Sequence, residues 1–316
     1  MALRSPSKKI VENTRLSAYT TFKLGGPCKG LIHCQTPEEL IEAVRELHEQ
    51  RVNFILMGGG SNLVVCDAGL DCHVIRYYSQ IPYVQEDNGK ISVSGSTILD
   101  DLVVHAAELG LEGINTCSGI PGTVGGAIVG NAGAFGKQIG DVITKATLLS
   151  KDGVLKTVTA QELGFSYRHS KLKETNDIVV EATLSLKEGD TAELLKERED
   201  LLKLRHEKHP DLAKEPCAGS FFRNIEPTSK AERRQATGYF LEQAGGKKLK
   251  AGGAYIYSKH ANIIIKGKNC SAKDVFELSQ KMAALAKEHF NLDLVREVRF
   301  VGKIDGMPAD NRDIIW

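Results

Sequence analysis

The chain has 316 residues, of which 41% are hydrophobic, and its 41 Lys and Arg residues nearly balance its 40 Asp and Glu residues. This length suggests two domains, with three as the alternative, and this apolar content is enough for each to form a core. A formal net charge of +1 excludes the basic excess of nucleic-acid-binding proteins. The sequence has no apolar run of about 18 residues, so we expect no membrane span.

The cysteines and histidines do not suggest a metal site. The seven cysteines are odd in number and contain no CxxC pair, which argues against both a disulfide framework and a metal site. His206 and His209 are one residue too close for the HExxH pattern of zinc enzymes. Residues 1–17 lack the apolar segment of a secretory signal. We therefore expect a cytoplasmic protein with reduced thiols, no metal and no obligate protein partner.

The first predicted elements are a helix and a strand. The helix spans residues 36–50 and starts with Thr36, Pro37 and Glu39 in the pattern of a capping box. A strand at residues 53–57 follows and leads directly into three glycines.

These glycines form the first candidate binding loop. A strand that ends in glycines lets backbone N–H groups come close to a diphosphate. The spacing does not match G-x-G-x-x-G and no helical pattern follows, so the loop does not fit a Rossmann unit. A plain turn is the alternative interpretation. The candidate cofactor-binding residues here are Gly58, Gly59, Gly60, Ser61, Asn62 and Leu63.

A second glycine-rich stretch spans residues 118–136. It holds seven glycines in nineteen residues, more than a turn requires. Glycine costs about 0.5–1 kcal/mol at each position of a regular element, so we expect an exposed loop that binds a phosphate or a flat ring, not a packed helix or strand. A tight corner between strands is the alternative. The candidate cofactor-binding residues here are Ser118, Gly119, Pro121, Gly122, Gly125, Gly126, Ala127, Asn131 and Gly133.

The remaining patterns alternate strands with a few helices, which predicts an α+β domain at residues 1–203 and a second unit at residues 204–316. In the first unit we expect strands at 91–95, 142–150, 154–158 and 177–186, a helix at 98–109 and a hairpin turn at Asp152-Gly153. A highly charged helix at 190–208 would be a solvated or connecting helix. In the second unit we expect a linker at 210–216, helices at 230–244 and 271–290, and strands at 254–257, 262–266 and 296–302.

Seven motifs follow one another along the chain, at residues 16–26, 56–65, 118–136, 165–170, 217–224, 252–267 and 294–302. In this order they resemble the UDP-N-acetylenolpyruvoylglucosamine reductase family. The resemblance is closest to the shorter subclass, because little sequence separates residues 170 and 218 and no long insertion appears in the C-terminal unit. Ile225 replaces a frequent proline, and residues 245–253 are unusually basic.

The resemblance implies a fold, a cofactor and a reaction. The fold is an FAD-binding domain of the vanillyl-alcohol-oxidase (PCMH) type in two subdomains, followed by an α/β substrate-binding domain. NADPH would reduce FAD, and flavin N5 would deliver hydride to C3 of the enolpyruvyl ether of UDP-N-acetylglucosamine, giving UDP-N-acetylmuramate for peptidoglycan. Both glycine loops would hold the FAD diphosphate. No histidine stands in the loop at residues 58–62, so we expect the FAD to be non-covalent.

The resemblance also implies catalytic roles for three residues. Ser220 would donate a proton to substrate C2, Arg168 would hold the enolate carboxylate, and Glu297 would act as an acid or an orienting group. A serine hydroxyl is a weak acid, so this role needs positive neighbours and a stabilised enolate. Taken alone, each residue has an ordinary alternative: a strand-end serine, a surface arginine and a solvated glutamate.

Four further residues match family positions near the substrate. Tyr167, Asn224 and His260 would lie near the UDP-sugar, and Lys208 near the diphosphate and NADPH. A packed strand-end histidine is the alternative for His260. Two rival functions stay open: an FAD oxidase of the same fold, and a binding module without chemistry.

Overall fold

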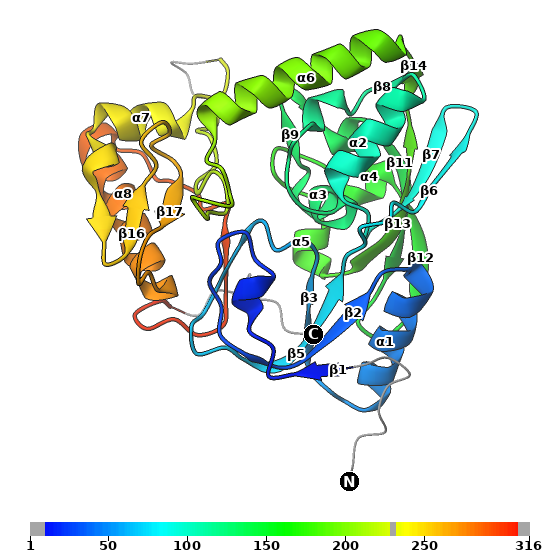
Figure 1. The fold of residues 1–316 in the computed structure, drawn as a ribbon, viewed down its shortest axis with the longest axis horizontal. Coiled ribbons are helices and arrows are strands. Elements are labelled where there is room, and N and C mark those ends of the chain that lie inside the picture. The colour runs from blue at the N-terminus through cyan, green and yellow to red at the C-terminus, as the bar shows by residue number, and fades with distance from the viewer. Residues whose placement is uncertain (1–9, 228–231, 309–316) are drawn as a thin grey trace.

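The computed structural model describes residues 10–227 and 232–308. Figure 1 shows a small sheet with one helix at the bottom, a second sheet with helices at the upper right, and a third unit at the left. Helix α6 (Thr191–Lys208) crosses the top from the second part to the third. The α+β class is confirmed, and the expected domain boundary at residues 203 and 204 falls inside α6.

The first sheet carries the first glycine loop at one edge. Its order is β1–β2–β5–β3, with β2, β5 and β3 parallel and β1 antiparallel to β2. Helix α1 (Pro37–Glu49) begins at the expected capping box of Thr36 and Glu39, and its buried Leu40 and Val44 pack on the sheet. The strands are β1 (Ile10–Glu12), β2 (Cys28–Cys34), β3 (Phe54–Met57) and β5 (Leu70–Tyr77), of which the sequence pattern predicts only β3.

The second sheet is antiparallel throughout, in the order β12–β11–β13–β7–β6. The hairpin expected at Asp152-Gly153 joins β11 and β12, and Gly153 has a φ of +76°. Helices α2 and α3 share one apolar core with this sheet. The elements are β6 (Val84–Asp87), β7 (Lys90–Ser94), α2 (Leu99–Glu108), α3 (Val124–Gly130), β11 (Ile143–Leu149), β12 (Leu155–Thr159) and β13 (Ile178–Ser185).

The third unit packs helix α8 on a three-stranded sheet and returns to the first part. Its last strand, β18 (Arg299–Val301), pairs in parallel with β4 (Leu63–Val65), directly after the first glycine loop. Phe22 and Val64 therefore share a core with Phe221 and Phe300. The other elements are α7 (Thr237–Gln243), β15 (Lys250–Ala251), β16 (Ala254–Ile256), β17 (Ile264–Lys266) and α8 (Ala272–Phe290).

Short elements complete the described chain. They include the 3-10 helices Leu16–Ala18, Asn115–Cys117, Ile139–Asp141 and Gly246–Lys248. The others are β8 (Leu111–Glu112), β9 (Gly133–Ala134), β10 (Lys137–Gln138), α4 (Ala160–Leu163), α5 (Leu172–Thr175) and β14 (Lys187–Glu188).

The prediction of a non-helical loop throughout residues 118–136 is wrong, because this stretch contains helix α3. Thr123 caps the helix by accepting a hydrogen bond from the Gly126 amide. Burial of Val124 and Ile128 in the core offsets the poor helix propensity of glycine. A Cβ on Gly125 would lie 3.0 Å from the Gly95 carbonyl oxygen, so glycine allows the helix to approach the sheet.

The predicted helix at residues 230–244 is too long. Residues 230 and 231 lie outside the described residues, and the helix that is described, α7, begins only at Thr237. Gln235 instead exchanges backbone hydrogen bonds with Ile225, in an antiparallel bridge. Pairing with the strand-like segment around Ile225, which lies outside the predicted helix, therefore overrides the local helical pattern.

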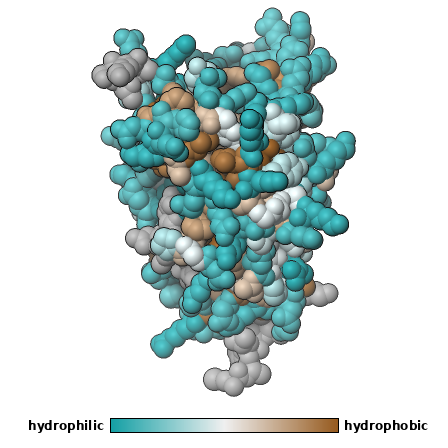
Figure 2. Space-filling model, turned by 90° about the vertical axis from the view of Figure 1, so that its left-hand side faces the viewer, coloured by the Kyte–Doolittle hydropathy of each residue, from teal (hydrophilic) through white to brown (hydrophobic). Residues whose placement is uncertain are grey.

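Figure 2 shows the outer face of the third unit, which is mainly hydrophilic. In the described part of the chain, no helix is long and apolar enough to cross a membrane. All seven cysteines are buried and none forms a disulfide bond, and residues 10–227 and 232–308 hold no metal-binding group of three or more His, Cys, Asp and Glu.

Candidate active site

The two predicted glycine loops lie against each other. The Ser61 hydroxyl donates a hydrogen bond to the Pro121 carbonyl oxygen at 2.9 Å. A Cβ on Gly59 would lie 3.0 Å from the Gly122 Cα, and a Cβ on Gly58 would lie 2.5 Å from the Thr123 hydroxyl oxygen. Side chains at residues 58 and 59 would therefore push the loops apart.

This contact leaves several backbone donors without an acceptor. Within the described residues, no acceptor is found for the amide groups of Gly59, Gly60, Ser61 and Gly122. Gly60 has a φ of +63°, and a Cβ there would collide with the Tyr19 carbonyl group. Converging amide donors on a glycine backbone fit an anionic group, so this junction is suited to a diphosphate.

Several other predicted cofactor residues form hydrogen bonds that hold the second glycine loop in place. The Ser118 hydroxyl donates to the Asn115 carbonyl oxygen at 2.5 Å, and the Gly119 amide donates to the Asp100 carboxylate at 2.7 Å. Asn131 is fully buried: its side chain donates to the Ser166 carbonyl oxygen and accepts from the Gly140 amide.

Of the predicted residues in α3, Ala127 is buried, whereas Gly126 is exposed. A Cβ on Gly126 would meet only the Thr123 hydroxyl oxygen within 4 Å, at 3.6 Å. Nothing in the protein itself therefore requires a glycine at position 126. Leu63 lies in β4 and pairs with Arg299.

Two of the three predicted catalytic residues form an ion pair. The Arg168 Nε atom lies 3.1 Å from Glu297 Oε1, and both side chains are about a quarter exposed, at 24% and 23%. Arg168 also donates to the Gly133 carbonyl oxygen at 2.8 Å, which ties it to the second glycine stretch. The Asn62 side chain donates to the Glu297 carbonyl oxygen at 3.2 Å. The ion pair is thus joined to both candidate cofactor loops.

A bulge directs the Glu297 side chain. The amides of Glu297 and Val298 both donate to the Phe221 carbonyl oxygen, at 2.9 and 3.4 Å, so two residues oppose one. A bulge of this kind breaks the alternation of side chains along a strand. Burial raises the pKa of the Glu297 carboxyl group, although the charges of Arg168, Lys173 and Arg223 oppose this rise.

Ser220 lies on the neighbouring segment, one residue before Phe221. Its backbone pairs with Ile263, and the Phe221 amide donates to the Asn262 carbonyl oxygen at 2.7 Å. The buried Asn262 side chain also bonds to both the amide and the carbonyl of Phe222. The Ser220 hydroxyl has no hydrogen-bond partner among the described residues, so it is available to a ligand.

The sequence analysis missed several residues around this pair. Asn262 holds the backbone beside Ser220, and Lys173 and Arg223 place positive charge near Glu297. Arg205 of α6 packs against Gly119 with its Nε and Nη2 atoms buried and lacking a hydrogen-bond partner in the described chain. A lysine or arginine in a charged helix gives no local signal of such burial.

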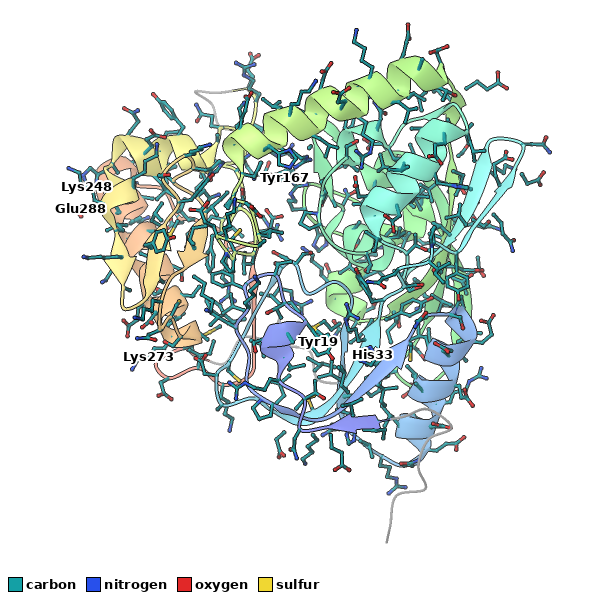
Figure 3. All side chains as sticks on the ribbon, viewed as in Figure 1. Tyr19, His33, Tyr167, Lys248, Lys273 and Glu288 are labelled. Carbon is teal, nitrogen blue, oxygen red and sulfur yellow. The ribbon has the colours of Figure 1, made fainter. Side chains whose placement is uncertain are left out.

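The predicted substrate residues divide into two groups. The Asn224 amide donates to the Tyr167 hydroxyl oxygen at 3.3 Å, and the Arg234 guanidinium lies 4.0 Å from the centre of the Tyr167 ring. Figure 3 shows Tyr167 below α6, between the third unit and the second part. These side chains face the same region as Arg168, whose guanidinium lies 5.4 Å from the Tyr167 ring.

His260 and Lys208 have different surroundings. The His260 ring stacks on His209 with 6.1 Å between ring centres, and its Nδ1 atom accepts from the Asn262 amide. Burial lowers the pKa of both histidines. Lys208 is exposed at the last residue of α6. The structure thus brings Tyr167 and Asn224 together, packs His260 and leaves Lys208 at the surface.

Comparisons with known proteins agree with this architecture. Residues 28–159 match a family model described as an FAD binding domain, and residues 210–301 match the C-terminal domain of UDP-N-acetylenolpyruvoylglucosamine reductase. Together with the glycine-loop junction, the first match defines a flavoenzyme of the PCMH type with an additional C-terminal domain.

Relatives and a solved structure identify the family. The chain is 37% identical over 303 residues to a UDP-N-acetylenolpyruvoylglucosamine reductase of Carboxydothermus hydrogenoformans, covering 94% of this chain and 95% of the relative. It is 33% identical over 296 residues to the reductase of Bacillus pumilus, covering 93% and 95%. The solved Thermus caldophilus reductase superimposes with a TM-score of 0.75 at 32% identity, covering 93% of this chain and 99% of that one. The chain belongs to the UDP-N-acetylenolpyruvoylglucosamine reductase family and is an FAD-dependent oxidoreductase.

Proposed function

We propose that this enzyme uses NADPH to reduce the enolpyruvyl ether of UDP-N-acetylglucosamine to UDP-N-acetylmuramate, a step of peptidoglycan synthesis. The observation that supports this most directly is the Arg168–Glu297 ion pair, which lies beside the Ser220 segment and is tied to both glycine loops. FAD, held at the junction of the two glycine loops, would supply the hydride-transfer chemistry between NADPH and C3 of the substrate.

The protein's own contribution is to bind, to stabilise charge and to supply a proton. Negative charge develops at C2 and the carboxylate of the substrate when hydride reaches C3. Arg168 would bind that carboxylate, since a guanidinium matches it in a bidentate geometry. The charge of Arg223 would lower the energy of the enolate.

Ser220 would then donate its proton to C2. Asn262 fixes the backbone beside Ser220, and the Ser220 hydroxyl group has no hydrogen-bond partner among the described residues. The hydroxyl group is therefore held in place and can donate to the substrate. The raised pKa of Glu297 suits a group that acts as an acid or orients the enol. The seven free cysteines support a reducing compartment, and we propose the cytoplasm.

The same proposal assigns the binding groups. The amide donors at the junction of the two loops would hold a non-covalent FAD through its diphosphate. Tyr167 and Asn224 would contact the UDP-sugar. Lys208 would attract the diphosphate of the substrate or of NADPH as a mobile point charge, which its exposure permits. His260 would line the UDP-sugar site from its stack on His209.

Ser220→Ala tests the proposal by separating the two halves of the reaction. Reduction of FAD by NADPH needs no proton at C2, so its rate should stay close to that of the wild type. Oxidation of the flavin by the enolpyruvyl substrate should slow by about 10²–10⁴-fold, the usual contribution of general-acid catalysis. Ser220→Cys should recover part of this rate, because a thiol is a stronger acid. Stopped-flow flavin absorbance measures both halves.

Ser258→Ala removes an exposed hydroxyl from the same unit and should leave both rates unchanged. If Ser220→Ala is oxidised by the substrate at the wild-type rate, Ser220 is not the donor. If the variant fails only with NADPH, Ser220 belongs to the first half and the assignment is wrong.

A further inference from the structure

A lysine that the mechanism above does not require lies directly behind the catalytic ion pair. The Lys173 ammonium group, on α5, donates a hydrogen bond to the Arg168 carbonyl oxygen at 2.7 Å. Arg168 has a φ of +54°, a left-handed conformation that is uncommon for residues other than glycine. A hydrogen bond to its carbonyl group helps to hold the backbone in this conformation, and hence the guanidinium against Glu297.

The charges around Lys173 are unbalanced. Arg168 lies in the loop before α5, Arg223 follows the Ser220 segment, and Arg299 and Glu297 belong to the last strand and its approach. Among the described residues whose charges shift the pKa of Lys173, Arg168, Arg223 and Arg299 are cations and Glu297 is a carboxylate, which is paired with Arg168. The cluster therefore has more cations than carboxylates, as expected of a site that receives an anion.

We propose that Lys173 is a positioning residue for the proton-transfer half of the reaction. It fixes Arg168 through the main chain and supplies positive charge for the carboxylate and the enolate of the substrate. This inference rests on the proposed function. It predicts that loss of the Lys173 charge slows oxidation of the flavin by the substrate and weakens binding of the carboxylate product, while reduction by NADPH is unaffected.

The charge of Lys173 should titrate within an accessible range. Burial, and then the charge of Arg223, lowers the pKa of Lys173 to about 8, although Glu297 acts in the opposite direction. The amine is protonated below that pH and neutral above it. The rate of the second half and the affinity for UDP-N-acetylmuramate should therefore both fall as the pH rises through about 8.

Three variants of the FAD-loaded enzyme test the inference. Lys173→Met should slow oxidation by the substrate by about 10- to 100-fold, the effect of removing one charged hydrogen bond, and should abolish the decline near pH 8. Lys173→Arg should keep a rate close to wild type but also lose the decline, because a guanidinium stays protonated. Lys171→Met removes an exposed lysine two residues away and should behave like the wild type. Stopped-flow absorbance gives the rate, and calorimetric titration with UDP-N-acetylmuramate gives the affinity.

The inference is overturned if Lys173→Met keeps the wild-type rate and affinity. If Lys173→Met does not fold or does not retain FAD, the Lys173→Arg variant decides. If its rate of flavin oxidation by the substrate still declines near pH 8, the inference is also overturned. The two proposals fail separately. A wild-type enzyme that the enolpyruvyl substrate cannot oxidise refutes the proposed function, whereas wild-type behaviour of both Lys173 variants in an active enzyme refutes only the role of Lys173.

Discussion

Substitution of Gly126 should change the stability of the fold and the affinity for FAD in opposite directions. It lies inside α3, where a glycine costs about 0.5–1 kcal/mol relative to alanine. A Cβ at this position would meet only the Thr123 hydroxyl oxygen within 4 Å, at 3.6 Å, which is an ordinary contact. Gly126→Ala should therefore stabilise the FAD-free protein by up to about 1 kcal/mol.

The same methyl group should weaken FAD binding. Gly126 is exposed in the stretch that meets the first glycine loop, where we propose that the diphosphate lies. If the diphosphate contacts the backbone there, the added Cβ occupies its space, and Gly126→Val adds two further methyl groups. We expect at least a tenfold loss of affinity for the alanine variant, equal to about 1.4 kcal/mol, and a colourless protein for the valine variant.

The measurement pairs two readings on the same samples. Thermal unfolding of the FAD-free protein reports the fold, and flavin fluorescence during titration with FAD reports the affinity. Gly130→Ala is the matched control, because it adds a methyl group to the same helix with no atom within 4 Å, and it should keep FAD. A Gly126→Val protein that keeps its full yellow colour would refute the assignment of this loop.

Two further predictions concern the flavin linkage and the acid stability of the protein. Acid precipitation should release FAD into the supernatant, because no histidine stands in the loop at residues 58–62; fluorescence that stays with the pellet contradicts this. Burial, more than the nearby charges of Arg205, His260 and Lys208, lowers the pKa of His209 to about 4, so the folded state disfavours its protonation. The contribution of neutral His209 to the free energy of unfolding should therefore be fully present above pH 6.5, the ordinary pKa of histidine. It should decrease as the pH falls from 6.5 towards 4. In His209→Phe, the free energy of unfolding should depend less on pH over this range, and an unchanged dependence would exclude His209.

The elements that the sequence predicts correctly have local signals. Thr36 and Glu39 cap α1, and Ser271 and Asp274 form the same capping box at the start of α8. Asp152-Gly153 sets the hairpin between β11 and β12. In each case the residues that determine the structure lie within a few positions of one another, so no distant contact is needed to predict it.

The elements predicted wrongly depend on distant contacts. Helix α3 forms because its apolar residues are buried and because Gly125 fits against Gly95. Gln235 and Ala236 do not join the helix, because Gln235 pairs with Ile225 and Ala236 has an extended backbone. A local pattern cannot show which segment will be the partner.

The residues of the candidate site also divide into those with a local sequence signal and those that are placed by contacts with other segments. The glycine loops were recognisable, since their composition is poor for regular structure and rich in accessible backbone. The direction of Glu297 was not, because it follows from a bulge against Phe221 on a separate segment. The role of Lys173 could not be predicted either, since its partner is a backbone carbonyl group rather than a carboxylate.

The return of the last strand to the first part of the molecule explains why Glu297 lies beside the first glycine loop. Strand β18 pairs with β4, and the Asn62 side chain donates to the Glu297 carbonyl oxygen, across a separation of 235 residues. A parallel pair cannot be closed by a tight turn and requires a long crossover, which here includes the whole third unit. The same pairing that buries Phe300 beside Val64 therefore places the Glu297 backbone next to the loop proposed to hold the cofactor. Packing of the third unit on the first part and the position of Glu297 therefore depend on the same strand pairing.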